Sequence, residues 1–410
     1  MRRSSRRHSQ RSLREWALRG GLALAATIAG YVSTTQTLAF VLGKSNAERA
    51  HAMAPGDGRL AGMLAEKQAA AEQAPAARAA TASLARHALA VEPLAASALT
   101  ALALTTQLDG NTPKARALFV HSDALSRREL GTRLWLIEDA VARNDVADAL
   151  RHYDIALRTS KNASELLFPI LVQAANDPAV ATALTNTLKT GPAWRDDFLT
   201  YFGGLGPNPL QTAAFFRRLA GARVPIPEVA RITVVNALAK DRQYRESWDY
   251  YRSLRPGVDP GRLRDPEFKA ALQTPSIFDW MPVVEDAGVS AEIADGAFDF
   301  SAPSTVGGVV LQQIQILPAG RYRLQGTFSG IKETAETTPY WQLSCMDGRD
   351  LGRVALPSTD SDEGSFAGEL TVTASCPVQN LRFIVRPSSN TSGVVGRIDR
   401  ALLVPVGTAG

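Results

Sequence analysis

A spacing of 34 residues limits most strongly what this chain can fold into. Thr81, Ala115, Ala149 and Ala183 lie one such step apart. The residues four positions on are Ala85, Phe119, Tyr153 and Thr187, and those seven positions on are Ala88, Ser122, Ala156 and Thr190. Positions i, i+4 and i+7 share one face of a helix, so each set predicts a helix that packs by that face. The small residues admit a neighbouring helix, and a ring such as that of Tyr153 fills the groove between hairpins.

The same period recurs in a preceding helix, which predicts paired helices. Leu99, Arg133 and Leu167 lie 34 residues apart there. Turn residues separate the two helices of each pair at "LDGNTP" (108–113), "ARND" (142–145) and "ANDP" (175–178). This is the period and the small-then-aromatic pattern of tetratricopeptide helix pairs.

We therefore predict an α-solenoid of such pairs over residues 57–254. A late pair, "EVARITVVNALAK" followed by "RQYRESWDYYRSL", places Ser247 and Tyr251 in the repeating positions. Its spacing from Ala183 is four residues short of two periods. "GGLGPNPL" (203–210) interrupts the pattern between them, so we expect a degenerate or reshaped hairpin there.

An uncharged stretch near the N-terminus, residues 20–43, predicts a transmembrane helix. Its 24 residues span about 36 Å as a helix, which is enough for a tilted crossing of the hydrocarbon core. Residues 1–19 hold seven Arg and one Glu, so we expect this basic tail in the cytoplasm and the body, after a spacer at 44–56, in the periplasm. A cleaved signal peptide, with a cleavage site at Ala50-His51-Ala52, and a buried helix of a soluble protein are the alternatives.

After the helical region the apolar pattern changes to a period of two, which predicts β-strands. "RYRLQGTF" (321–328) and "ELTVTASC" (369–376) alternate apolar residues with polar ones. Further strands are predicted at 309–316, 340–345, 381–385 and 396–406. We therefore predict an antiparallel, jelly-roll-like β-sandwich at 276–407, joined to the helices by a linker at 255–275. The expected fold class is α + β with several domains.

The chain contains two cysteines, Cys345 and Cys376. Each ends the apolar face of a predicted strand, so both thiols point toward the same core. In an oxidising compartment such a pair is most simply a disulfide, whereas a structural zinc site would need four ligands. We predict a bond between Cys345 and Cys376, and neither a metal nor a cofactor.

Two stretches of the chain resemble a known protein family. They are "SRRELGTRLWLIEDAVARNDVADALRHYDIALRTS" (126–160) and the segment from "WQLSC" to "SCPVQNLRFIV" (341–385). Both are similar to membrane-anchored tetratricopeptide-repeat proteins of Gram-negative bacteria that end in a sandwich like that of carbohydrate-binding modules, and that occur with exopolysaccharide loci. The family has no established activity, so the resemblance implies no catalytic residue. Arg133 and Thr187 stand where the family has bulky apolar groups, which implies an irregular solenoid.

Polar and aromatic residues of two predicted strands form a candidate sugar platform. Tyr340 and Gln342 lie on the polar side of one strand, and Arg321, Arg323 and Gln325 on the polar side of another. An exposed ring stacks on the apolar side of a pyranose, while amide and guanidinium groups bond its hydroxyls. We expect these five residues to form one surface if the sandwich binds glycan.

The helical region offers candidate contacts for a protein partner at Arg127, Arg128, Arg133 and His152. The arginines form a positive patch near the start of a helix, which could receive an acidic polymer or the carboxylates of a partner. Solvated helix surface is the simpler interpretation of the arginines. We expect His152 at the surface or in a groove.

The sequence predicts no catalytic constellation. Histidine does not occur after residue 152, so the sheet domain lacks an imidazole for a Ser-His-Asp or Cys-His arrangement. Asp360, Asp362 and Glu363 cluster in one loop, where a calcium site or an acid and base pair is the alternative to a solvated turn. Because the excess of basic charge lies in the terminal tail, we expect no nucleic-acid partner.

The predicted protein is a non-enzymatic scaffold of the bacterial envelope. Its solenoid groove binds a protein partner, because stacked hairpins create an extended surface without any reactive group. Its sandwich binds glycan or a second protein, in exopolysaccharide production or export. A purely structural adaptor without glycan binding and an enzyme that acts on envelope polysaccharide are the alternatives.

Overall fold

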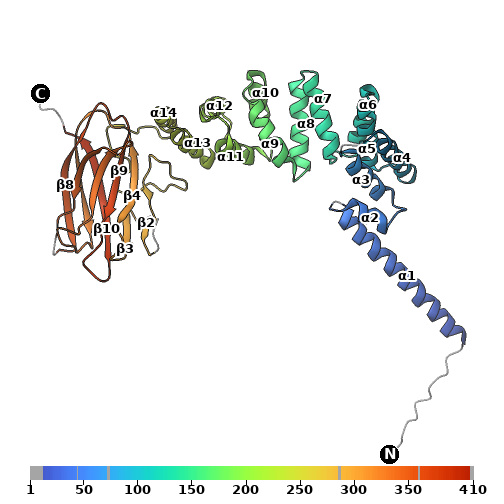
Figure 1. Ribbon diagram of the computed structural model, residues 1–410, viewed down its shortest axis with the longest axis horizontal. Coiled ribbons are helices and arrows are strands. Elements are labelled where there is room, and N and C mark those ends of the chain that lie inside the picture. Colours follow the sequence, from blue (N-terminus) through green and yellow to red (C-terminus); the bar gives the residue numbers. More distant parts are fainter. Residues whose placement is uncertain (1–12, 44, 72–73, 285–287, 359–360, 407–410) are drawn as a thin grey trace, which may run out of the picture. The chain divides into compact units, whose positions relative to one another are not determined.

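Figure 1 shows the computed structural model, which describes residues 13–43, 45–71, 74–284, 288–358 and 361–406. Within these ranges it contains 14 helices and two five-stranded antiparallel sheets. The predicted α + β class is therefore confirmed. The chain divides into two compact units, residues 1–167 and 168–410. Most of the predicted basic tail, residues 1–12, lies outside the described residues.

The helices have these bounds. They are α1 (Leu13–Gly43), α2 (Ala47–Met53), α3 (Gly58–Ala69), α4 (Pro75–Val91), α5 (Ala96–Leu108), α6 (Thr112–Leu125), α7 (Leu130–Ala142), α8 (Val146–Thr159), α9 (Ala163–Ala174), α10 (Pro178–Lys189), α11 (Arg195–Leu205), α12 (Pro209–Gly221), α13 (Glu228–Lys240) and α14 (Tyr244–Leu254).

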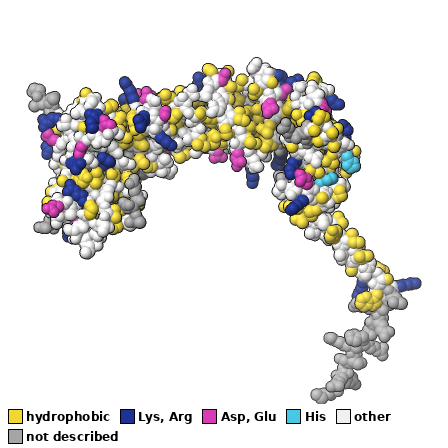
Figure 2. Space-filling model, viewed as in Figure 1, with side chains coloured by type: hydrophobic (Ala, Val, Ile, Leu, Met, Phe, Trp, Pro, Cys, Tyr) yellow, Lys and Arg dark blue, Asp and Glu magenta, His cyan; other side chains and the backbone are white. Residues whose placement is uncertain are grey.

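Helix α1 is long and apolar enough to span a membrane. Hydrophobic side chains cover much of its surface (Figure 2), and most of them are exposed. This agrees with the transmembrane prediction for residues 20–43. A signal sequence has the same length and composition, so the helix by itself does not separate an anchor from a cleaved segment.

The predicted spacer at 44–56 is wrong in its centre, because α2 occupies residues 47–53. Ala50 of α2 is 1% exposed and packs with Ala39 of α1 and Leu60 of α3 in a small core. A Cβ added at Gly43 would lie 3.2 Å from Leu60 Cδ2. The end of α1 is therefore packed directly on the first helices of the body.

In unit 1 the positions predicted by the 34-residue period are buried. They are Thr81, Ala85 and Ala88 in α4, Ala115, Phe119 and Ser122 in α6, and Ala149, Tyr153 and Ala156 in α8. The ring of Phe119 stacks on Trp135 of α7 with the centroids 4.3 Å apart. The predicted turns also form, since Asn111 and Asp145 cap α6 and α8 and Asn144 adopts a φ of 56°.

In unit 2 the period changes, so the predicted register at Ala183 is wrong. Ala183 and Thr187 are half-buried and Thr190 is exposed. The buried set is instead Ala181, Thr185 and Leu188 in α10, then Thr212, Phe216 and Leu219 in α12, then Ser247 and Tyr251 in α14. The pair α11–α12 is the reshaped hairpin expected near residues 203–210.

In α6, α8, α10, α12 and α14 the buried face starts at a fixed distance from the N-cap. Each cap lies four residues before the first buried small residue, whose N–H donates to the carbonyl of the cap. The caps are Asn111, Asp145, Asp177, Asn208 and Gln243. In α6, α8, α10 and α12 the side chain of the cap also accepts a backbone N–H of the first turn, which fixes where the helix begins. The buried face therefore follows the cap when the preceding segment shortens, whatever the number of residues in the repeat.

The C-terminal part of unit 2 is a β-sandwich. Its strands are β1 (Met281–Pro282), β2 (Ser290–Ala294), β3 (Ala297–Ala302), β4 (Gly308–Gln315), β5 (Gly320–Ser329), β6 (Tyr340–Cys345), β7 (Asp350–Ala355), β8 (Glu363–Val372), β9 (Gln379–Val385) and β10 (Val394–Pro405). The strand orders are β1-β4-β9-β6-β7 and β2-β3-β10-β5-β8. From β3 to β10 this is jelly-roll order, as predicted. The sequence pattern missed β1, β2, β3 and β7.

Aromatic rings fill the space between the two sheets. Trp341, which is 0% exposed, lies 4.8 Å from Phe383 and 5.7 Å from Trp280 between ring centroids. Gly326 leaves room for a further ring, since an added Cβ there would come within 2.6 Å of Phe366 Cζ. Alternate residues of each strand therefore point into this core, and the residues between them lie on the outer faces of the sandwich.

The predicted linker at 255–275 is part of the sandwich instead. Leu263 and Phe268 are buried in its core, and the Leu263 N–H donates to Leu403 O at 3.3 Å. The indole N–H of Trp280 donates to Asp265 O at 2.9 Å. The apolar side chains of this segment explain the difference, because each gains free energy by leaving water.

The sandwich packs on the last helix of the same unit. Tyr251 of α14 donates a hydrogen bond to Asp279 Oδ1 at 2.6 Å. The ring of Phe278 lies 5.2 Å from that of Trp248 and 5.3 Å from that of Tyr251. Arg264 reaches the same place, where its guanidinium lies over Trp248 and donates to Phe278 O.

Candidate functional site

The outward side of the β1-β4-β9-β6-β7 sheet carries a row of polar side chains. Gln312 of β4, Arg382 of β9, Gln342 of β6 and Arg353 of β7 stand at paired positions of four neighbouring strands. Trp341 and the other alternate residues point into the core, so this row points away from it. Since neighbouring strands lie about 4.8 Å apart, the row is roughly 14 Å long.

Further polar residues extend this row into a surface that we call the polar face. It consists of Gln312, Tyr340, Gln342, Ser344, Asp350, Arg353, Asn380, Arg382 and Arg386. All of these residues except Arg386, which follows β9, lie on strands of the one sheet. The regular alternation of the strands therefore brings together residues that are up to 74 positions apart in the sequence.

Hydrogen bonds fix the side chains in the middle of the polar face. Arg382 Nη2 donates to Gln342 Oε1 at 3.0 Å and to Ser344 Oγ at 3.1 Å. Asn380 Nδ2 donates to Gln312 Oε1 at 3.1 Å. Side chains held in this way lose little conformational entropy when a ligand binds.

Two atoms of the polar face are buried without a hydrogen-bond partner among the described residues. They are Arg382 Nε, which is a donor, and Asn380 Oδ1, which is an acceptor. Leaving such groups unpaired costs about 1–3 kcal/mol each. Both atoms lie beneath the surface, so they count against the stability of the fold and are not presented to a ligand.

Tyr340 holds two arginines and is not an open ring. The guanidinium of Arg386 lies 4.7 Å from the ring centroid and that of Arg353 lies 5.5 Å from it. Arg386 Nη1 also donates to Glu336 O at 2.7 Å. A sugar that stacks on Tyr340, as the sequence predicts, would therefore share the ring with two cations that it already attracts.

Asp350 is the acid of the polar face. It accepts a hydrogen bond from Arg353 Nε at 2.9 Å. Its burial works against ionisation, but hydrogen bonds from the Gly352 N–H and Gln342 and the charge of Arg353 outweigh that effect, so the pKa of Asp350 lies below its usual value. The carboxylate is ionised at neutral pH and neutralises one of the three arginines.

The structure does not bring the five residues of the predicted sugar platform together. Tyr340 and Gln342 lie in the sheet of the polar face, whereas Arg321, Arg323 and Gln325 lie on β5 of the other sheet. Both groups point outward, so the whole sandwich separates them. The reason is the jelly-roll order, in which the chain changes sheets between β5 and β6.

The residues of the second group have separate surroundings. Arg321 forms an ion pair with Glu369 of β8. Gln325 lines a shallow hollow of about 270 Å³ together with Thr327, Ser365 and Arg400. This outward face of the second sheet has fewer arginine contacts with aromatic rings than the polar face, and it offers matched positions for control variants.

Two of the four candidate partner contacts in the helical region are buried. Arg127 and Arg128 are exposed, but Arg133 is 1% and His152 is 3% exposed, so the prediction that these two lie at the surface is wrong. Arg133 forms an ion pair with Asp123, and its Nη1 lies 3.0 Å from His152 Nδ1. A paired cation can occupy a core position that is otherwise apolar.

Burial also sets the protonation of this pair. Burial and the charge of Arg151 lower the pKa of His152 to about 4, and the same two causes lower the pKa of Arg133 to about 10. At neutral pH His152 is neutral and Arg133 is charged, so the imidazole accepts a hydrogen bond from the guanidinium. Both residues therefore stabilise the junction of α7 and α8.

The acidic loop is only partly described. Asp360 lies outside the described residues. Asp362 forms an ion pair with Lys332 at 2.8 Å, and Glu363 is exposed at the start of β8. Within the described ranges there is no group of three His, Cys, Asp or Glu side chains that could hold a metal ion.

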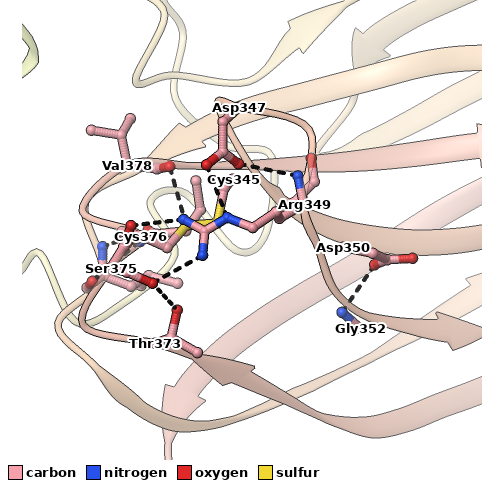
Figure 3. Close-up of a disulfide and its surroundings, with 12 residues drawn as sticks. Cys345, Asp347, Arg349, Asp350, Gly352, Thr373, Ser375, Cys376 and Val378 are labelled. Carbon is pink, nitrogen blue, oxygen red and sulfur yellow. Dashed lines mark hydrogen bonds and ion pairs between the residues drawn. A yellow bond between two sulfur atoms is a disulfide. The ribbon is translucent and has the colours of Figure 1, made fainter.

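The predicted disulfide is present between Cys345 and Cys376 (Figure 3). Cys345 ends β6, but Cys376 lies in the β8–β9 connection, because β8 ends at Val372. Arg349 lies beside the bond, where its Nε donates to Asp347 and its Nη1 to Ser375 Oγ, both at 2.9 Å (Figure 3). The bond and the arginine together join the β6–β7 turn to the β8–β9 connection.

Comparison with known proteins adds little to this description. No protein-family model and no curated protein matches the chain. One similar solved structure is described as "CBM4 structure and function"; it is 12% identical with a TM-score of 0.28, and the match covers 35% of this chain and 99% of that one. A second is TmCBM61 in complex with beta-1,4-galactotriose, which is 18% identical with a TM-score of 0.25 over 36% of this chain and 97% of that one. A third is the enzymatically active domain of tailspike protein 4 of bacteriophage CBA120, which is 16% identical with a TM-score of 0.24 over 36% of this chain and 21% of that one. TM-scores this far below 0.5 carry no conclusion about the fold or the function of the chain.

The sequence analysis missed seven of the nine residues of the polar face, among them all three of its arginines and Asn380. Arg353, Asn380, Arg382 and Arg386 were not predicted as site residues, although Arg382 stands between core residues in "LRFIV" (381–385). A polar residue at an alternate position of an otherwise apolar strand is the signal that marks it. The order of strands in the sheet is also needed, because only the pairing of β9 with β6 brings Arg382 to Gln342.

Proposed function

We propose that this chain is a non-enzymatic envelope adaptor whose sandwich binds glycan at the polar face. The observation that carries the proposal is the fixed row of amide, hydroxyl and guanidinium groups on one sheet. Such groups hydrogen-bond sugar hydroxyls and contain no activated nucleophile. We propose exopolysaccharide production or export as the setting of this role, and the resemblance described above supports that proposal.

The test is glycan binding by the full-length protein in detergent micelles, measured on a glycan array and by affinity electrophoresis. We expect the variant Arg382→Ala/Gln342→Ala to bind at least tenfold more weakly than the wild type, since hydrogen bonds to a charged group contribute about 1.5–3 kcal/mol each. The matched control is Arg323→Ala/Gln325→Ala on the other sheet, which should bind normally.

Three outcomes would contradict the proposal. Equal losses in both variants would place the site elsewhere on the sandwich. Absence of glycan binding by the wild type would favour a purely structural adaptor, and cleavage of a bound polysaccharide would favour an enzyme.

We also propose that α1 is retained as a single-pass inner-membrane anchor, with the N-terminus in the cytoplasm and the body in the periplasm. The packing of α1 supports retention, because Ala39 and Gly43 cover Leu60, and cleavage at Ala50-His51-Ala52 would expose it. Sequencing the N-terminus of the mature protein should show residues upstream of Ala50. A mature chain that begins at Met53, or a C-terminal reporter that is active only in the cytosol, would refute this.

The helix pairs, which we propose to be tetratricopeptide repeats, would bind a protein partner. Of the four predicted contacts, the structure leaves Arg127 and Arg128, in the α6–α7 turn, exposed. Photo-cross-linking groups at these two positions should capture one partner in cells. The same groups at Arg262, exposed in the other unit, are the control, and identical cross-linked products from both places would contradict a specific contact.

A further inference from the structure

We infer that the glycan bound by the polar face is acidic and carries carboxylate groups, as uronic acid polymers do; this inference rests on the proposed glycan binding. The face contains three arginines, Arg353, Arg382 and Arg386, and one acid, Asp350, which pairs with Arg353. Among the described residues, no carboxylate forms an ion pair with Arg382 or Arg386. The face therefore keeps an excess of two positive charges.

The arginines are oriented before any ligand binds. Tyr340 supports Arg353 and Arg386 by its ring, and Gln342 and Ser344 accept hydrogen bonds from Arg382. A guanidinium held in one plane matches a planar carboxylate with two parallel hydrogen bonds. Immobilising arginine beforehand reduces the entropy lost on binding, so the affinity gained for each contact is larger.

The neutral groups of the face suit the remainder of such a polymer. Gln312 and Gln342 present amides in the same row as Arg382, and Asn380 presents a third amide two residues along β9. Amides both donate to and accept from sugar hydroxyls, whereas a site built for charge alone would need none. The row of roughly 14 Å is long enough for several polar groups to act on one chain. Charge and amides in one row therefore favour a uronate polymer over a neutral polysaccharide.

The experiment compares three kinds of polymer with the full-length protein in detergent micelles. Polygalacturonate and alginate are the carboxylated probes, dextran and galactan the neutral ones, and dextran sulfate the control for charge without carboxylate. We expect binding to the carboxylated polymers that is at least tenfold tighter than to the others and that weakens in 1 M NaCl, where the Debye length falls to about 3 Å.

Single substitutions then assign the charges. Arg382→Gln and Arg386→Gln should each weaken uronate binding about tenfold, because each removes one charge-assisted contact. Arg323→Gln on the other sheet removes the same charge and should have no effect. Asp350→Asn should tighten binding, since it frees Arg353 from its acid, and a misfolded variant could not produce that gain.

The outcomes separate this inference from the function on which it rests. Tight binding of neutral polymers only would overturn the acidic ligand and leave glycan binding intact. Equal affinity for dextran sulfate would overturn carboxylate recognition. Failure of the wild type to bind any of the polymers, or on the glycan array, would overturn both.

Discussion

Breaking the Cys345–Cys376 bond should destabilise the sandwich and leave the helices of unit 1 unchanged. The two cysteines are 31 residues apart in the sequence. In the chain-entropy relation a closed loop of this length lowers the entropy of the unfolded chain enough to stabilise the folded state by about 3.7 kcal/mol at 25 °C. This is a large share of the 5–15 kcal/mol that is typical of a whole domain.

Hydrogen exchange followed by mass spectrometry measures this effect in the full-length protein, because peptides from each unit are observed separately. In the variant Cys345→Ala/Cys376→Ala, amides of β6 and β9 that exchange through unfolding of the sandwich should lose protection about 500-fold, which is the factor that corresponds to 3.7 kcal/mol. Amides of α6, in the other unit, should exchange at the wild-type rate.

Reductant separates the bond from the substitutions. Wild-type protein treated with dithiothreitol should lose protection in the same peptides, and the double variant should not respond to it. If oxidised and reduced wild type exchange at the same rate, the loop-closure argument fails. If both thiols titrate as free in protein extracted under non-reducing conditions from cells, the argument for an oxidising compartment fails as well.

Three other perturbations test the buried polar groups. Asp123→Ala should lower the free energy of unfolding by about 3 kcal/mol, because it leaves Arg133 charged and unpaired in the core. Arg133→Met removes the charge and should therefore lower it less, which thermal melts followed by circular dichroism would measure. His152 has a pKa of about 4 in the folded chain and 6.5 in the unfolded chain, so the unfolded chain binds the proton first as the pH falls. About 3 kcal/mol of stability that is present above pH 6.5 should therefore be lost by pH 4. His152→Gln should lack this contribution, and an identical change in stability between pH 7 and pH 4 in the wild type and in His152→Gln would refute it. Tyr251→Phe removes the hydrogen bond to Asp279 and should destabilise the α14–sandwich contact by about 1–2 kcal/mol, which faster exchange at residues 276–282 would reveal; an unchanged rate would contradict the role of this bond.

The helical body was largely predictable from the sequence because its packing is local. Ala115, Phe119 and Ser122 lie within two turns of one helix, so their spacing predicts the buried face directly. The prediction failed at Ala183, since the register of α10 follows its cap Asp177 and not the length of the repeat. Burial of Arg133 could not be predicted, because Asp123 and His152, which make it tolerable, come from neighbouring helices.

The candidate site was less predictable because it depends on which strands become neighbours. The alternation of polar and apolar residues placed Gln342 and Gln325 on outward faces correctly. It could not show that these are the faces of two different sheets, since a jelly roll and a meander have the same period of two. The polar face is formed by the pairing of β9 with β6, and their sequences are separated by two other strands.

The burial of Leu263 and Phe268 changes where the sandwich can be cut. A fragment that starts at the predicted boundary, residue 276, would lack both side chains and the carbonyl that receives the indole hydrogen of Trp280. Such a fragment would expose core apolar side chains to water, and we expect it to aggregate. Dissection of this protein should therefore cut ahead of α9, near the boundary between the two compact units, so that α14 and the helices packed before it stay with the strands.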